Sequence, residues 1–141
     1  MNWNEFDEET QKLARMISFS PDIVIGIARG GIIPGALLCK FLGVRDMNVL
    51  RMRREGEERR ITADILSDIS GKKILLVEDM IETGRSLIAG KKYLEERGAE
   101  VKTACLYIMS ISEIKPDYFL KEITGVADFP WNNRLGTAKH E

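Results

Sequence analysis

The segment Ile74–Leu87 joins an apolar run to a set of acidic and hydroxyl residues. Its first part, Ile74–Val77, has the composition of a short strand that is buried on both faces. Glu78 and Asp79 follow directly, and burying two adjacent carboxylates is costly unless hydroxyls, cations or a metal ion meet them. The acid pair therefore offers hydrogen-bond acceptors that suit the hydroxyl groups of a sugar.

A turn that suits an anion follows these acids. Thr83, Gly84 and Ser86 stand where the pattern changes to that of an amphipathic helix. Such a turn provides free backbone N–H groups, two hydroxyls and the positive end of a helix dipole. Acceptors for sugar hydroxyls thus precede donors for a phosphate by one turn, and a phosphorylated sugar would satisfy both.

A second apolar run, Ile23–Ile27, leads into a glycine-rich loop formed by Ala28, Arg29, Gly30 and Gly31. Two consecutive glycines allow the backbone to approach an anion closely. Arg29 adds a planar fork of donors, which matches phosphate oxygens. This loop is therefore a second candidate for binding phosphate groups.

Helical and strand patterns alternate along the chain, which predicts right-handed crossovers and a parallel sheet. Both candidate loops follow the carboxyl ends of strands, where open α/β sheets bind ligands. The sequence therefore predicts one α/β domain over residues 1–141, with a twisted, mainly parallel sheet flanked by helices. Ile61–Leu66 is ambiguous, and a final extended region reaches Phe129. The predicted helices are Phe6–Ser18, Pro34–Leu42 and Arg85–Arg97, and the predicted strands are Ile23–Ile27, Met47–Met52, Ile74–Val77 and Val101–Met109.

The composition narrows the possible functions only slightly. The net charge of −1 favours neither nucleic acid nor an anionic membrane. The start of the chain lacks an apolar signal core, and no apolar run reaches the ~18 residues of a membrane span. Cys39 and Cys105 have no metal-site spacing and are interpreted as core residues of a cytoplasmic protein. His140 lies in the terminal tail and receives no role.

The segment around the acid pair resembles the signature of the type I phosphoribosyltransferases, in which a hydrophobic strand precedes two acids, two variable residues and an acid-Thr-Gly turn. The resemblance implies that Glu78 and Asp79 hold the ribose hydroxyls of phosphoribosyl pyrophosphate and contact a magnesium ion. It also implies that the third acid, Glu82, handles the proton of the base as a catalytic residue. The turn residues that would bind the 5′-phosphate are Thr83, Gly84, Arg85 and Ser86.

The glycine-rich loop is similar to the pyrophosphate loop of the purine phosphoribosyltransferases of hypoxanthine and xanthine-guanine type. The resemblance implies that Ala28, Arg29, Gly30 and Gly31 bind pyrophosphate, and that the Ala28–Arg29 peptide is a candidate for a cis bond. The implied reaction displaces pyrophosphate from ribose C1 by a ring nitrogen of a nucleobase, as in purine salvage, and yields a nucleoside monophosphate. A homodimer is expected from the resemblance alone.

The segment 51–60 contains five arginines and three glutamates around Gly56. One interpretation is a solvated charged hairpin. The other is the mobile loop of the family, which closes over pyrophosphate with one or two arginines, of which Arg60 is our choice. A nucleic-acid patch is disfavoured, because the net excess is two positive charges and no aromatic residue interleaves.

The base-binding half departs from the purine pattern. We expect a hood built from about residues 1–5 and 110–141. Met109 stands where purine-specific relatives have a lysine, Val126 stands at the stacking position, and Asn132 replaces an acid. Met109 cannot donate a hydrogen bond and Val126 has no flat face, whereas Asn132 both donates and accepts. These changes redirect base choice or abolish it.

Other classes of protein remain as alternatives. A non-catalytic regulator that binds phosphoribosyl pyrophosphate or a nucleotide would account for the altered base contacts. A dinucleotide-dependent oxidoreductase is disfavoured because Ala28 replaces the middle glycine of the fingerprint. A P-loop nucleotidase is disfavoured because the Thr83 turn lacks the first glycine and the lysine.

Overall fold

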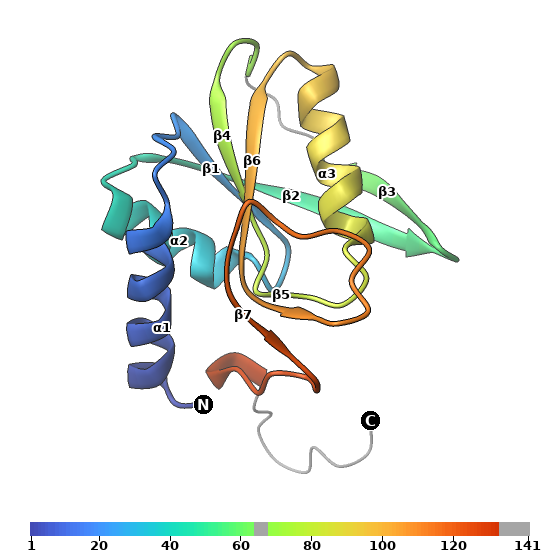
Figure 1. The fold of residues 1–141 in the computed structure, drawn as a ribbon. Helices are drawn as coiled ribbons and strands as arrows, with labels where there is room; N and C mark the ends of the chain where they lie inside the picture. Colours follow the sequence, from blue (N-terminus) through green and yellow to red (C-terminus); the bar gives the residue numbers. More distant parts are fainter. Residues whose placement is uncertain (64–67, 133–141) are drawn as a thin grey trace.

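The computed structural model describes residues 1–63 and 68–132, which form a sheet with helices on both sides (Figure 1). Residues 64–66 of the ambiguous segment, residues 133–141 of the expected hood and His140 lie outside the described residues. In chain order the elements are α1 (Trp3–Met16), β1 (Ile23–Ile27), α2 (Ile32–Leu42), β2 (Asp46–Glu55), β3 (Glu58–Ala63), β4 (Lys73–Val77), β5 (Met80–Ile81), α3 (Arg85–Glu96), β6 (Glu100–Met109), β7 (Tyr118–Ile123) and the 3₁₀ helix η1 (Pro130–Asn132).

The central strands are parallel and follow the order β2-β1-β4-β6. β3 adds an antiparallel strand beside β2, and β7 pairs with β6 in parallel. β5 continues the line of β4 along β6, because Val77 pairs with Ala104 and Met80 pairs with Tyr107 in the same register. The acid pair therefore lies at the short interruption between β4 and β5. The parallel order of the central strands confirms the predicted mainly parallel α/β fold.

Helices cover the two faces of the sheet unequally. Figure 1 shows α3 on one face and α1 with α2 on the other. Leu87 and Leu94 of α3 pack against Ile25 and Leu76. On the opposite face, α1 and α2 pack over Val24, Leu75 and Val77 through the buried side chains of Phe6, Leu13 and Leu38. Successive residues of β4 thus face two different apolar layers, which explains the unbroken apolar run before the acids.

Several predicted boundaries differ from the structure by one to three residues. α1 begins at Trp3 rather than Phe6, because Asn2 and Glu5 form a capping box in which each side chain accepts a hydrogen bond from the other residue's backbone N–H. It also ends at Met16, two residues before the predicted end. The charged segment 51–60 continues β2 into a hairpin with β3 that turns at Gly56, which agrees with the charged-hairpin interpretation of this segment. Within the described residues, every helix is too short or too polar to cross a bilayer.

Candidate active site

The acid pair lies where β4 gives way to β5, and its backbone remains bonded to β6. Glu78 N donates to Ala104 O at 3.1 Å, and Leu106 N donates to Asp79 O at 3.1 Å. The Oδ1 atom of Asp79 also accepts from its neighbour Met80 N at 2.6 Å. Because the backbone is held in this way, both acids are placed at the carboxyl edge of the sheet.

The glycine-rich loop lies directly against this acid pair. A Cβ atom on Gly30 would lie 2.5 Å from Oδ2 of Asp79, so a larger residue would displace this carboxylate. The peptide bond between Ala28 and Arg29 is cis, as predicted. The two candidate loops, which are far apart in the sequence, therefore line one continuous surface.

Gly31 has a different role from the one predicted. Its N–H donates to Ile27 O at 2.8 Å, so this group is not directed to a ligand. Gly31 is buried and precedes α2 as its N-cap. A side chain there would collide with the backbone of Val77 and Ile27, so the residue allows close packing of the loop on the sheet. The prediction failed because the sequence shows a glycine pair but not which amide faces outward.

Burial of the acid pair perturbs both carboxyl groups. Burial raises the pKa of Glu78 to about 8, and the neighbouring charge of Asp79 adds to this effect. Burial also raises the pKa of Asp79, against the opposing effect of the Met80 N–H. Among the described residues, neither carboxylate belongs to an ion pair. Two acids that are desolvated without a cation form a site that hydroxyl donors or a metal ion would stabilise.

The anion turn has the geometry that the sequence indicated. Gly84 adopts a left-handed conformation with φ of +88° and precedes the first residue of α3, Arg85. The Arg85 N–H donates to Thr83 Oγ1 at 3.3 Å. The first turn of α3 contains no acidic residue of its own, and it lines the cavity beside Ser86, to which it presents the positive end of the helix dipole.

Two adjoining cavities contain these groups. The larger has a volume of about 940 Å³ and is lined by the glycine loop and the acid pair, together with Trp131 and Asn132. The smaller, of about 270 Å³, lies over the anion turn and includes the exposed Glu82. The cavities share four lining residues, which are Arg54, Arg59, Glu78 and Ser86.

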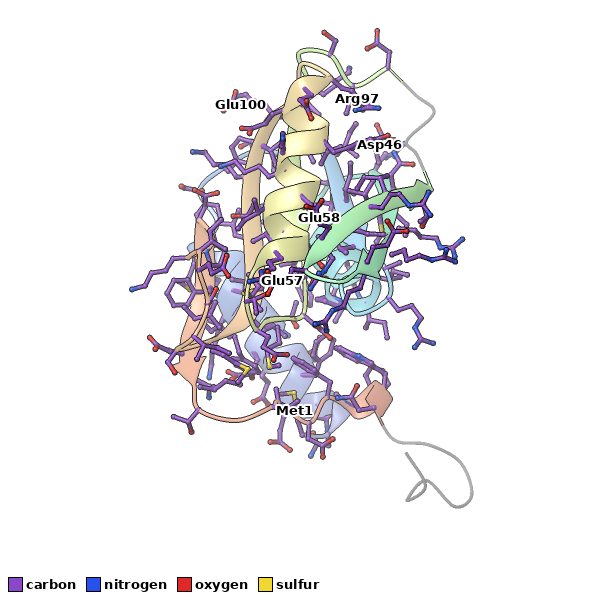
Figure 2. The ribbon with its side chains drawn as sticks, turned by 90° about the vertical axis from the view of Figure 1, so that its right-hand side faces the viewer. Met1, Asp46, Glu57, Glu58, Arg97 and Glu100 are labelled. Carbon is purple, nitrogen blue, oxygen red and sulfur yellow. The ribbon has the colours of Figure 1, made fainter. Side chains whose placement is uncertain are left out.

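The structure brings Arg59, rather than Arg60, to the cavities. Arg59 Nε donates to Ser86 Oγ at 3.2 Å, whereas Arg60 is exposed and its Nε pairs with Glu55 at 3.0 Å. Adjacent residues of a strand point to opposite sides, so only one of the two arginines can face the cavity. Arg54 lies directly opposite Arg59 in the hairpin and shares its side. Figure 2 shows the hairpin tip at Glu57 beside the first turn of α3.

The base-binding positions are only partly brought together. Asn132 lines the larger cavity, as expected, but Val126 is 76% exposed and lines a separate hollow beside Tyr107. Met109 lies at the end of β6, paired with Ile123, and does not line either cavity.

Trp131 lines the cavity instead, and the sequence reasoning missed it. Its ring stacks on Phe129 with centroids 4.7 Å apart and lies edge-on to Phe6 at 4.8 Å. The Pro-Trp pair next to Asn132 was the available signal, but it did not indicate which face of the hood the ring would occupy.

The donor set fits a cation that is shared with a substrate. The described residues contain no cluster of three or more His, Cys, Asp or Glu side chains that could hold a metal ion by themselves. Mg²⁺ usually keeps several waters and binds through one or two carboxylates together with substrate phosphates. Asp79 and Glu78 supply that number of carboxylates, and Asp79 contacts the loop where phosphate would bind.

An open, mainly parallel sheet with an acid pair, a glycine-rich loop and an anion turn at its carboxyl edge is an arrangement that suits a phosphorylated sugar. The sequence profile described as the phosphoribosyl transferase domain matches residues 2–135. The chain belongs to this family.

Two relatives illustrate the likeness. The chain superimposes on the crystal structure of a purine phosphoribosyltransferase from Pyrococcus horikoshii Ot3 with a TM-score of 0.89 and 30% identity, over 99% of this chain and 97% of the other. A hypoxanthine-guanine phosphoribosyltransferase from Lactococcus lactis is 37% identical over 106 residues, which cover 68% of this chain and 58% of the relative.

A third relative differs in length. A ribose-phosphate pyrophosphokinase from Parasynechococcus marenigrum is 29% identical over 96 residues, or 68% of this chain. The chain spans only 27% of the length of that protein.

Proposed function

We propose that this protein is a phosphoribosyltransferase that transfers the ribose 5-phosphate of phosphoribosyl pyrophosphate to a nucleobase. The bond from ribose C1 to pyrophosphate breaks, and a bond from C1 to a ring nitrogen of the base forms. One observation carries the proposal: the acid pair, the glycine loop and the anion turn line two adjoining cavities of about 940 and 270 Å³. This arrangement offers separate places for the sugar, the pyrophosphate and the 5′-phosphate.

The sugar and its phosphates would be held by groups of opposite character. Asp79 and Glu78 accept hydrogen bonds from the ribose hydroxyls and hold magnesium. A bound magnesium ion would neutralise charge on the departing pyrophosphate. The N–H groups of Arg29 and Gly30 and the Arg59 guanidinium stabilise the same negative charge. Ser86 and the free N–H groups of α3 bind the 5′-phosphate.

The base would lie against Trp131. This ring is fixed by its stack on Phe129 and lines the larger cavity, so it offers a flat apolar face to a nucleobase. Asn132 supplies an amide that both donates and accepts. Glu82 would handle the proton of the base from the rim of the smaller cavity. The names of the relatives favour a purine base and a salvage role.

The proposal also covers the cellular compartment, the partners and the oligomeric state of the protein. Two free cysteines, Cys39 and Cys105, are buried, which suits a reducing cytoplasm. The net charge of −1 gives no support for a nucleic-acid or membrane partner. A homodimer is proposed on family likeness alone.

Turnover with single bases tests the proposal. The protein is incubated with phosphoribosyl pyrophosphate, Mg²⁺ and hypoxanthine, guanine, xanthine, adenine or uracil in turn. We expect at least one purine to yield equal amounts of pyrophosphate and nucleoside monophosphate. Binding of the sugar donor without turnover of any base would instead support the non-catalytic alternative, which the names of the relatives do not favour. Absence of donor binding would contradict both.

A further inference from the structure

Residues 112–114, here called the strap, lie against the outer side of the anion turn. Ser112 Oγ donates to Ile114 O at 2.6 Å and lies 3.3 Å from Ile114 N, so the strap closes on itself. The N–H of Glu113, between them, donates to Thr83 O at 2.9 Å. The strap is thus bonded to the backbone of the turn that would hold the 5′-phosphate.

The strap also fills the space behind Gly84. A Cβ atom on Gly84 would collide with Cγ2 of Ile114 and would lie 3.3 Å from Ser112 Oγ. Gly84 already needs glycine for its φ of +88°. The left-handed turn therefore rests on the strap, and a shift of the strap would change the direction of the turn's N–H groups.

A charge contact joins the strap to the first residue of α3. Arg85 Nε and Nη2 both donate to Glu113 Oε1, at 3.2 and 3.0 Å. On its other side, Arg85 Nη1 lies 3.5 Å from Glu57 Oε1 at the hairpin tip, the position that Figure 2 labels. A cation at the start of a helix is disfavoured by the helix dipole, so Glu113 supplies a counter-charge that α3 itself lacks.

The segment that follows the strap is anchored to β6. Pro116 is buried, and the Asp117 carboxylate accepts from Thr103 N at 2.8 Å and from Thr103 Oγ1 at 3.1 Å. Asp117 N donates back to Thr103 Oγ1 at 3.0 Å. Ser112 N also donates to Met109 O, at the end of β6, so β6 holds the chain before and after the strap. The strap can therefore act as a fixed support rather than a loose loop.

We propose that Glu113 is a positioning residue of the phosphate site. It acts through Arg85 and the Thr83–Gly84 backbone, and it keeps the N–H groups of the anion turn directed at the 5′-phosphate. This inference rests on the proposed function, because the turn must bind that phosphate. Glu113 itself does not line either ligand cavity.

Whether removal of the Glu113 side chain weakens or tightens phosphate binding distinguishes a positioning role from simple charge repulsion. Removing a negative charge near a bound phosphate dianion should tighten binding, because a repulsion is lost and Arg85 is released. Loss of support should weaken binding, because the turn is no longer held in its binding conformation. Glu113→Ala therefore gives opposite results under the two explanations.

The experiment compares the dissociation constants of phosphoribosyl pyrophosphate and of ribose 5-phosphate, both with Mg²⁺, by calorimetry. We expect Glu113→Ala to weaken both by about 10-fold, with kcat changed less than about 2-fold. Ile114→Ala changes no charge and should weaken both roughly 3-fold. Glu113→Gln, which keeps an acceptor for Arg85, should recover part of the loss.

Glu57→Ala is the matched control, because it removes the other acidic partner of Arg85 without touching the strap. It should change binding less than about 2-fold, as expected for an exposed ion pair. Tighter or unchanged binding in Glu113→Ala would overturn the inference while the wild type still binds. If the wild type binds neither ligand, the proposed function itself fails. If Glu113→Ala does not fold, Ile114→Ala and Glu113→Gln decide the question by the same constants.

Discussion

The two halves of the site are built in different ways. The sugar-phosphate half comes from two short segments, the loop after β1 and the stretch from Glu78 to Ser86, which both follow parallel strands. The hood end is assembled from distant parts of the chain: Phe6 of α1, Tyr107 of β6, and Phe129 with Trp131 near the described end. The order of the parallel strands brings the residues of the first half together, whereas contacts between aromatic rings bring together those of the second.

The halves also differ in electrostatic state. In the sugar-phosphate half, two carboxyl groups have raised pKa values because they are buried without a cation. In the hood, the one buried phenol is satisfied: Tyr107 Oη donates to Glu9 Oε1 at 2.9 Å, while Lys12 and Lys121 lie 3.2 and 3.6 Å from the Glu9 carboxylate. The carboxylates of the first half therefore lack a counter-charge from the described residues of the protein, whereas these polar groups of the second half already have partners within it.

The largest effect should come from replacing Asp79, because it combines a sugar contact, a metal contact and a contact with Gly30. We expect Asp79→Asn to lower kcat/KM by about 100- to 1000-fold, since an amide cannot neutralise a cation. Steady-state kinetics with varied Mg²⁺ would measure this loss. Asp46→Asn is the control, because Asp46 is an exposed acid at the amino end of β2, and its kcat/KM should not change. A loss below about 3-fold in Asp79→Asn would contradict the assignment.

A smaller effect should separate two neighbouring arginines of the hairpin. Arg59→Ala should raise the KM for phosphoribosyl pyrophosphate by about 30-fold, because a charged hydrogen bond to phosphate is lost. Arg60→Ala should change it less than about 2-fold, because its exposed pair with Glu55 contributes little. Equal effects of the two changes would show that the hairpin contributes only its total charge.

The sugar-phosphate half could be predicted because its determinants are local. An apolar run followed by Glu78 and Asp79 identifies a strand end, and Thr83-Gly84 identifies a helix start, without knowledge of any partner segment. The same local logic gave the end of α2 at Leu42, before Gly43 with its φ of +71°, whereas the Ala28–Arg29 cis bond was implied by the family resemblance. Gly31 was the exception, because the direction of one amide depends on its bond to Ile27.

The arginine that faces the cavity and the packing of the hood could not be predicted in the same way, because long-range packing decides them. The register of the β2–β3 pair places Arg54 opposite Arg59, and this pairing sets which arginines face the cavity. Trp131 faces the cavity because Phe6 and Phe129 hold it, and Phe6 lies more than 120 residues earlier. A single-residue error at either point exchanges the inward and outward side chains.

The hood can be tested independently of the sugar-phosphate half. Trp131→Leu keeps an apolar side chain but removes the flat face, so the KM for the base should rise about 10-fold. The dissociation constant of phosphoribosyl pyrophosphate should stay within about 2-fold of the wild type. Trp131→Phe is the control, since it retains an aromatic ring and should recover most of the loss. Equal weakening of both ligands would show that the hood and the sugar site are not separate units.

The smallest effect concerns stability and tests whether the acid pair is uncompensated in the free protein. Glu78 has a pKa of about 8 in the folded chain against a reference value of 4.5. Between these values the folded state retains a proton that the unfolded state has released, so the free energy of unfolding should fall as pH rises from about 5 to 8. Glu78→Gln removes this dependence, and its Tm relative to wild type should increase by several degrees across that range.

Thermal unfolding with a chelator present measures the difference without any contribution from bound metal. The exposed Glu82 provides the comparison, because Glu82→Gln should give a Tm curve parallel to that of the wild type. Added Mg²⁺ should then reduce the advantage of Glu78→Gln at pH 8, because the ion stabilises the ionised carboxylates of the wild type. If the Glu78→Gln and wild-type curves remain parallel, the acid pair is already compensated in the free chain, and the electrostatic contrast between the two halves would not hold.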